Sequence, residues 1–111
     1  MQAGSLRVLG VASPERNPLY AGTPTIAESG YPGFAAVSWN GISAPAGTPP
    51  DIVAKLNDLA AKALHKQDIK KKLEDQGFVV VGGTPQAYGD LIRSEIAKWG
   101  AVITEAGIKA E

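Results

Sequence analysis

A stripe of apolar residues toward the end of the sequence constrains the fold of this chain more than any other feature. These residues recur at intervals of three and four: Tyr88, Leu91, Ile92, Ile96, Trp99, Val102 and Ile103. The spacing predicts a helix of about five turns with one wide apolar face. Because apolar surface is unfavourable in water, this face requires other structure to pack against it.

A second amphipathic helix is predicted to begin at Thr48. Its hydroxyl suits an N-cap, and Pro49 suits the first helical position. An apolar stripe at helical spacing then follows: Ile52, Leu56, Leu59, Ala60 and Ala63. The sequence therefore predicts two long helices, each with an apolar side.

Other start and stop signals divide the rest of the chain. Thr84–Pro85 repeats the helix start ahead of the last helix, and Thr23–Pro24 predicts a short helix that ends near Ser29. A further helix is predicted over 68–76, with Gly77 as its C-terminal stop.

Two short apolar runs, 6–12 and 78–81, are typical of buried strands. A third strand is predicted over 34–44, where Val37, Trp39 and Gly41 alternate with Ser38, Asn40 and Ile42. Their alternation with the helices indicates an α/β layered fold. A sheet of three short strands is too thin to cover both helical stripes. We therefore expect apolar surface that the chain cannot cover by itself.

The charge balance argues against nucleic acid as a partner. Eleven basic residues offset eleven acidic ones in 111 residues, whereas a nucleic-acid binder normally carries a basic surplus. The densest basic run, Lys70–Lys72, has acidic neighbours at Asp68, Glu74 and Asp75, which indicates a solvated helix face. The sequence contains no cysteine, so disulfides and thiolate chemistry are excluded.

The sequence contains no recognisable set of catalytic residues. We therefore expect that the chain is not an enzyme and that it binds no cofactor. His65 is the single histidine, expected on an exposed helix surface, and no serine stands in a Gly-x-Ser-x-Gly elbow. What remains is Trp39–Asn40–Gly41, where an aromatic and an amide could line a small-molecule cleft. A glycine in a strand often marks close approach by a ligand or another chain. The alternative is that Trp39 is a packing residue.

An ordered set of short motifs runs through nearly the whole sequence. Its members are Leu6–Ser13 with Arg16, Thr23–Phe34, Ser38–Gly41, Ala44–Pro49, Ile96–Trp99 and Ala106–Lys109. In this order they resemble the Bug, or TctC-like, periplasmic solute receptors of tripartite tricarboxylate transporters. The resemblance implies the C-terminal third of such a receptor, with a partial periplasmic-binding-protein type 2-like fold that is incomplete without the N-terminal part.

The resemblance also implies a division into lobes and a function. Residues 1–33 would be a remnant of the second lobe, 34–44 the inter-lobe crossing strand, and 45–111 the C-terminal part of the first lobe. The parent receptor would capture a small carboxylate in the periplasm and deliver it to membrane permease subunits. This chain alone would bind weakly or not at all. The ligand-contacting residues it implies are Ser13, Trp39 and Asn40.

Two further expectations concern the isolated chain. Its start, Met1–Ser5, lacks the charged and apolar regions of an export signal. Uncovered apolar surface predicts a homo-oligomer, with exchange of elements between copies as one route to burial. The alternative function is an autonomous small α/β interaction module that binds a partner through the Trp99 face of the last helix.

Overall fold

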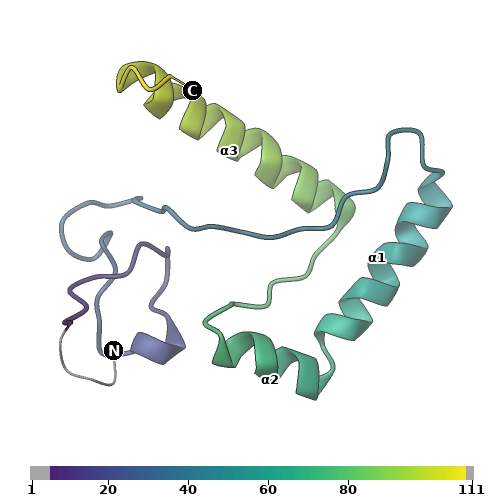
Figure 1. Ribbon diagram of the computed structural model, residues 1–111, viewed down its shortest axis with the longest axis horizontal. Helices are drawn as coiled ribbons and strands as arrows, with labels where there is room; N and C mark the ends of the chain where they lie inside the picture. Colours follow the sequence, from purple (N-terminus) through teal and green to yellow (C-terminus); the bar gives the residue numbers. More distant parts are fainter. Residues whose placement is uncertain (1–5, 110–111) are drawn as a thin grey trace. The chain divides into compact units, whose positions relative to one another are not determined.

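The computed structural model describes residues 6–109 and divides the chain into two compact units (Figure 1). Unit 1 is Met1–Asn40 and unit 2 is Gly41–Glu111. The division falls inside the predicted crossing stretch 34–44.

Unit 1 is a set of loops joined by a few backbone hydrogen bonds. Val11 forms an isolated parallel bridge with Thr25: its N–H donates to Pro24 O, and its carbonyl accepts from Ile26 N, both at 3.0 Å. Residues 6–40 contain one short helical turn, η1 (Pro18–Tyr20), where Asn17 Oδ1 accepts from Leu19 N at 2.9 Å.

The strand predicted over 6–12 is therefore wrong as a strand, and so is the helix predicted from Pro24. Within the described residues, Val11 alone of that run forms a β-bridge, because a strand needs a neighbouring backbone to pair with. Residues 26–30 form turns instead of a helix. The hydrogen-bonded cap starts at Thr25, and Gly30 (φ 108°) leaves the helical region before a second turn can form.

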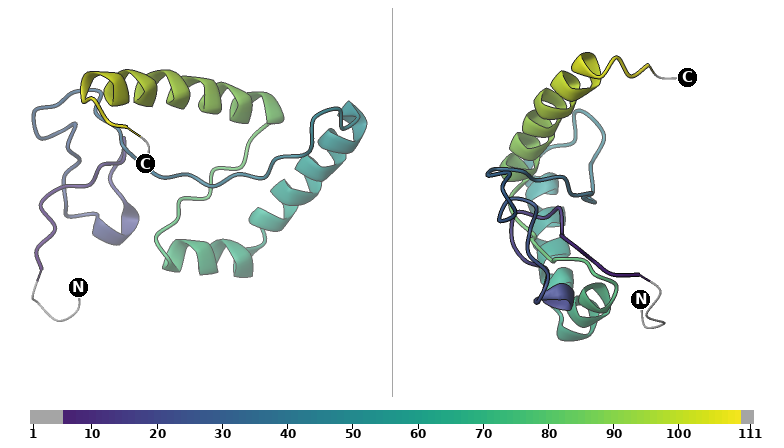
Figure 2. Two further views of the ribbon diagram at one scale, coloured as in Figure 1. Left: turned by 45° about the horizontal axis from the view of Figure 1, so that its top comes forward. Right: turned by 90° about the vertical axis from the view of Figure 1, so that its left-hand side faces the viewer.

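Unit 2 contains α1 (Pro50–Leu64), α2 (Gln67–Asp75) and α3 (Pro85–Glu105). Figure 2 shows α2 turning away from α1 at a short bend. All three helices agree with the prediction within two residues. None of the helices in 6–109 has the length and apolar content of a membrane span.

The predicted N-cap at Thr48 is wrong by one residue. Pro49 is the N-cap, in extended conformation (φ −55°, ψ 139°), and α1 begins at Pro50. A proline disfavours the helical region for the residue before it, so Pro50 keeps Pro49 out of the helix. The Thr48 hydroxyl donates back to Pro45 O at 2.8 Å instead.

The N-cap at Thr84 is confirmed, and the two threonines make a matched test. Thr84 Oγ1 accepts from Ala87 N at 3.1 Å. Thr84→Ala is expected to lower the free energy of unfolding of α3 by about 1 kcal/mol, because one helical N–H loses its acceptor. Thr48→Ala should cost less, since its hydroxyl caps no helix. Amide hydrogen exchange in the first turns of α1 and α3 measures both; equal losses would contradict the assignment.

Glycines end α2 and α3, and the stop at Gly77 confirms the prediction. Gly77 (φ 90°) and Gly107 (φ 63°) follow the C-caps. The next residue in each case donates to a carbonyl three positions inside the helix end, Phe78 N to Leu73 O at 3.0 Å and Ile108 N to Ile103 O at 3.1 Å. This is the Schellman arrangement.

The strands predicted over 34–44 and 78–81 are not formed within the described residues. Val79, Val80 and Val81 make no backbone hydrogen bond to any part of 6–109. Their side chains have strand propensity, but propensity does not supply the neighbouring strand, about 4.8 Å away, that pairing requires.

The expectation of uncovered apolar surface agrees with the burial pattern. Thr25, 1% exposed, is the one buried residue among those described, and no hydrophobic side chain in 6–109 is buried. On the helices, Leu56 is 53% exposed and Ile96 69%, and in the extended segment Val81 is 81% exposed. Unit 2 thus has helices with apolar sides and no core between them.

Candidate functional site

The three sequence-predicted ligand contacts all lie in unit 1. A backbone hydrogen bond from Ala36 N to Ala12 O, 2.9 Å long, joins the two segments that carry them. Ser13 directly follows Ala12, and its hydroxyl donates to Glu15 O at 2.6 Å. Trp39 is 39% exposed and Asn40 is exposed. The fold therefore brings the two segments together, while the Ser13 hydroxyl is directed along its own loop.

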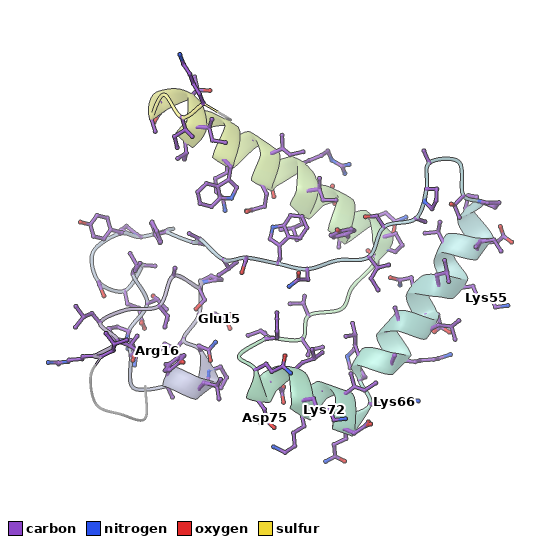
Figure 3. All side chains as sticks on the ribbon, in the orientation of Figure 1. Glu15, Arg16, Lys55, Lys66, Lys72 and Asp75 are labelled. Atoms are coloured by element: carbon purple, nitrogen blue, oxygen red, sulfur yellow. The ribbon has the colours of Figure 1, made fainter. Side chains whose placement is uncertain are left out.

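A hydrogen-bonded cluster holds the loop that follows Ser13. The Glu28 carboxylate accepts from Thr25 N at 2.7 Å, and Thr25 Oγ1 accepts from Glu28 N at 3.0 Å. Arg16 Nε donates to both carboxylate oxygens of Glu28, at 3.0 and 3.1 Å. Figure 3 shows Arg16 beside Glu15 in this loop. The cluster thereby links the loop at Arg16 to the turn at Thr25.

The hydrogen bond from Thr25 N, followed by the Arg16 guanidinium, holds the pKa of Glu28 below its ordinary value. In the sequence, Arg16 and Glu28 were noted only within the motifs of the family resemblance. The signal that predicts the cluster is the capping-box pattern Thr25-x-x-Glu28, which was not recognised there. What the cluster does is structural: it fixes the backbone next to Ser13.

Gly41 also has a specific neighbour that the sequence did not reveal. The prediction was close approach by a ligand or another chain. In unit 2 the approaching group is the ring of Tyr88, from the first turns of α3.

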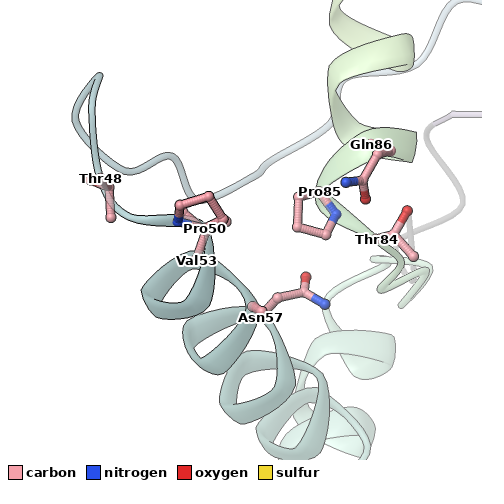
Figure 4. Close-up of a pocket in the computed structure, with 8 residues that line it drawn as sticks. Thr48, Pro50, Val53, Asn57, Thr84, Pro85 and Gln86 are labelled. Carbon is pink, nitrogen blue, oxygen red and sulfur yellow. The ribbon is translucent and has the colours of Figure 1, made fainter.

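A depression of about 450 Å³ lies between the N-terminal ends of α1 and α3 (Figure 4). Its lining contains no charged residue: Thr48, Pro50, Val53, Ala54, Asn57, Thr84, Pro85 and Gln86. Both threonine hydroxyls are engaged in the local hydrogen bonds described above. None of the sequence-predicted contacts lines it, so it does not add to the candidate site.

The charged residues of the helices pair along their own helix, as predicted for a solvated face. On α2, Lys71 Nζ lies 3.1 Å from Asp75 and Lys70 Nζ 3.7 Å from Glu74. His65 is exposed, with Nδ1 2.7 Å from Ala61 O, as expected.

Glu95 makes specific contacts with its neighbours on α3. It accepts from Trp99 Nε1 at 2.7 Å and pairs with Lys98, and its side chain is 17% exposed. The ammonium of Lys98 lies 5.0 Å from the Trp99 ring centroid. This cluster orients Trp99 on α3.

Comparison with solved structures defines the class of protein. The fold matches a structure described as R. palustris Rpa4515 with adipate, with a TM-score of 0.76 and 40% sequence identity. The match covers 96% of this chain and 36% of that chain. The predicted fold class, part of a solute-receptor fold, is therefore confirmed.

Sequence comparison then gives the family. The profile of the tripartite tricarboxylate transporter family receptor, TctC, matches residues 1–108, and the chain belongs to this family. It is a family of transport receptors and not of enzymes, as the sequence analysis expected.

Two similar proteins show the same partial coverage. A protein of the tcbD–tcbE intergenic region of Pseudomonas sp. strain P51 is 39% identical over 97% of this chain and 32% of its own length. Protein BugT of Bordetella pertussis is 36% identical over 98% of this chain and 33% of its own length. The chain thus spans about a third of the length of these relatives.

Proposed function

We propose that this chain forms the C-terminal third of a periplasmic receptor that captures a small carboxylate for a tripartite tricarboxylate transporter and delivers it to the permease subunits. The observation that carries the proposal is the 40% identical structure with adipate, matched over 96% of this chain. Adipate is a dicarboxylate, so we assign small dicarboxylates as the first ligand class to test.

The lobes are assigned as the resemblance implies. Residues 1–33 belong to the second lobe, 34–44 cross between lobes, and 45–111 complete the first lobe. Support comes from the division into compact units between Asn40 and Gly41, inside the proposed crossing.

Ser13, Trp39 and Asn40 are proposed to contact the carboxylate. Trp39 has an indole N–H and Asn40 an amide NH₂, and the Ser13 hydroxyl would exchange its hydrogen bond to Glu15 O for one to the ligand. A ligand pocket normally buries about 70–90% of its ligand. Residues 6–109 bury a single residue of their own, so the isolated chain is proposed to bind weakly.

The exposed apolar sides of α1 and α3 support a further proposal about the isolated chain. In the receptor they would be covered by the remaining two-thirds of the protein. We propose that, when that part is absent, copies of the chain associate and bury the apolar sides of α1 and α3 against one another.

A hybrid receptor tests the ligand proposal. The matched segment of Rpa4515 is replaced by this chain, and adipate is titrated by isothermal calorimetry. The hybrid is expected to bind adipate, while the isolated chain binds far more weakly. Asn40→Ala or Trp39→Ala in the hybrid should weaken binding by about tenfold to a hundredfold, the effect of losing a hydrogen bond to a charged group.

Lys55→Ala, on the exposed surface of α1, is the matched control and should leave the affinity unchanged. Rpa4515 itself gives the reference affinity, and thermal unfolding shows that each hybrid is folded. A folded hybrid that binds neither adipate nor citrate would overturn the proposed function.

A further inference from the structure

Gly41 lies against a neighbouring side chain, and its backbone conformation does not by itself require glycine. Its φ is outside the left-handed region, so other residues could adopt the same backbone. A Cβ added there, however, would overlap Cε2, Cζ and Oη of Tyr88. The outer part of the Tyr88 ring thus lies directly against the backbone of Gly41.

The backbone of Tyr88, the other residue of this contact, is held by hydrogen bonds at the start of α3. Tyr88 lies in the first turns of α3, and its N–H donates to Thr84 O at 3.1 Å. The Thr84 cap fixes the same turn through Ala87 N. The side chain is half-buried. Movement of Gly41 away from the ring would therefore expose part of the tyrosine.

We propose that Tyr88 is a positioning residue: its ring holds the backbone at Gly41 and thereby limits the conformational freedom of the two residues that precede it, Trp39 and Asn40. Gly41 is the first residue of unit 2, and consecutive Cα atoms are about 3.8 Å apart, so a fixed Gly41 confines the two residues before it. The role of Trp39 and Asn40 in ligand contact rests on the proposed function, whereas the contact between Tyr88 and Gly41 does not depend on it.

The aromatic ring of Tyr88 makes the contact with Gly41, and the phenol hydroxyl is not needed for it. Tyr88→Phe should therefore preserve the contact, and Tyr88→Leu should abolish it. Gly41→Ala should displace the ring. In the Tyr88→Leu background the added methyl group has room, so Gly41→Ala should there have a much smaller effect.

Nuclear magnetic resonance of this chain tests the contact between Tyr88 and Gly41 without any ligand. Protons held against an aromatic ring are shifted by its ring current, so the Gly41 α-protons should lie away from random-coil positions. That shift should be lost in Tyr88→Leu and kept in Tyr88→Phe. Lys55→Ala, on the exposed surface of α1, is the control and should leave this shift unchanged.

Fluorescence of Trp39, recorded in a Trp99→Phe background, tests positioning. Its emission maximum should move in Tyr88→Leu and in Gly41→Ala, and stay in place in Tyr88→Phe. The proposal would be overturned if the Gly41 α-protons of the unaltered chain had random-coil chemical shifts. It would also be overturned if the Trp39 emission maximum were the same in Tyr88→Leu and Gly41→Ala as in the unaltered chain. Loss of adipate binding by the hybrid with these signals intact would count against the proposed function alone.

Discussion

Replacing Thr25 with valine is expected to destabilise unit 1 by about 1–2 kcal/mol, the cost of losing a helix-type cap at a buried position. Valine keeps the volume of the side chain but cannot accept the hydrogen bond from Glu28 N. Because Thr25 is 1% exposed, water cannot readily replace that acceptor. Amide hydrogen exchange at Glu28 and Ile26 measures the loss directly.

Thr25→Ser is the matched control for this substitution. It keeps the hydroxyl that accepts from Glu28 N and removes only a methyl group. Its effect should be clearly smaller than that of valine. If serine and valine accelerate exchange equally, the cluster is held by packing at Thr25 and not by the reciprocal hydrogen bonds.

The same cluster predicts a dependence on pH. The pKa of Glu28 in the folded chain lies below its ordinary value of 4.5, so the ionised form stabilises the fold. This contribution is fully present above the unfolded pKa and is lost as the pH falls through the lowered folded pKa. Protection of the Thr25 amide should fall in that acid range. Glu28→Gln should reduce protection at neutral pH and flatten the dependence.

Local signals in the sequence predicted the helices well. The α3 boundaries follow from the Thr84 cap and the glycine at 107, both of which act within a few residues of the chain. The error at Thr48 is also local: the second proline, Pro50, decides where α1 begins. The strands failed for a different reason, since Val79–Val81 has the composition of a strand but no paired neighbour in the described residues.

The candidate site was less accessible from the sequence. Thr25-x-x-Glu28 is a short pattern that predicts a capping box from the sequence alone. The Gly41–Tyr88 contact was not, because the two residues are far apart along the chain and only tertiary structure brings them together. Ser13 was predicted from the resemblance alone, whereas Trp39 and Asn40 were also indicated by their residue types, and the role of all three in ligand contact stays a prediction.

The second large effect is expected in the state of association. At micromolar concentration the isolated chain should sediment as a dimer or larger assembly, because Leu56, Leu59 and Ile96 are each more than half exposed. Burying one such side chain contributes about 1.5–3 kcal/mol. Leu56→Gln combined with Ile96→Gln should therefore raise the dissociation constant by at least about tenfold.

Analytical ultracentrifugation over a dilution series measures this constant. Lys55→Gln, also exposed on α1, is the control and should leave it unchanged. Sulfate should tighten the assembly, since it strengthens apolar burial, whereas an assembly held by ion pairs would loosen as salt rises. A chain that stays monomeric at high micromolar concentration, with α1 and α3 intact, would contradict the idea that these helix sides need a cover.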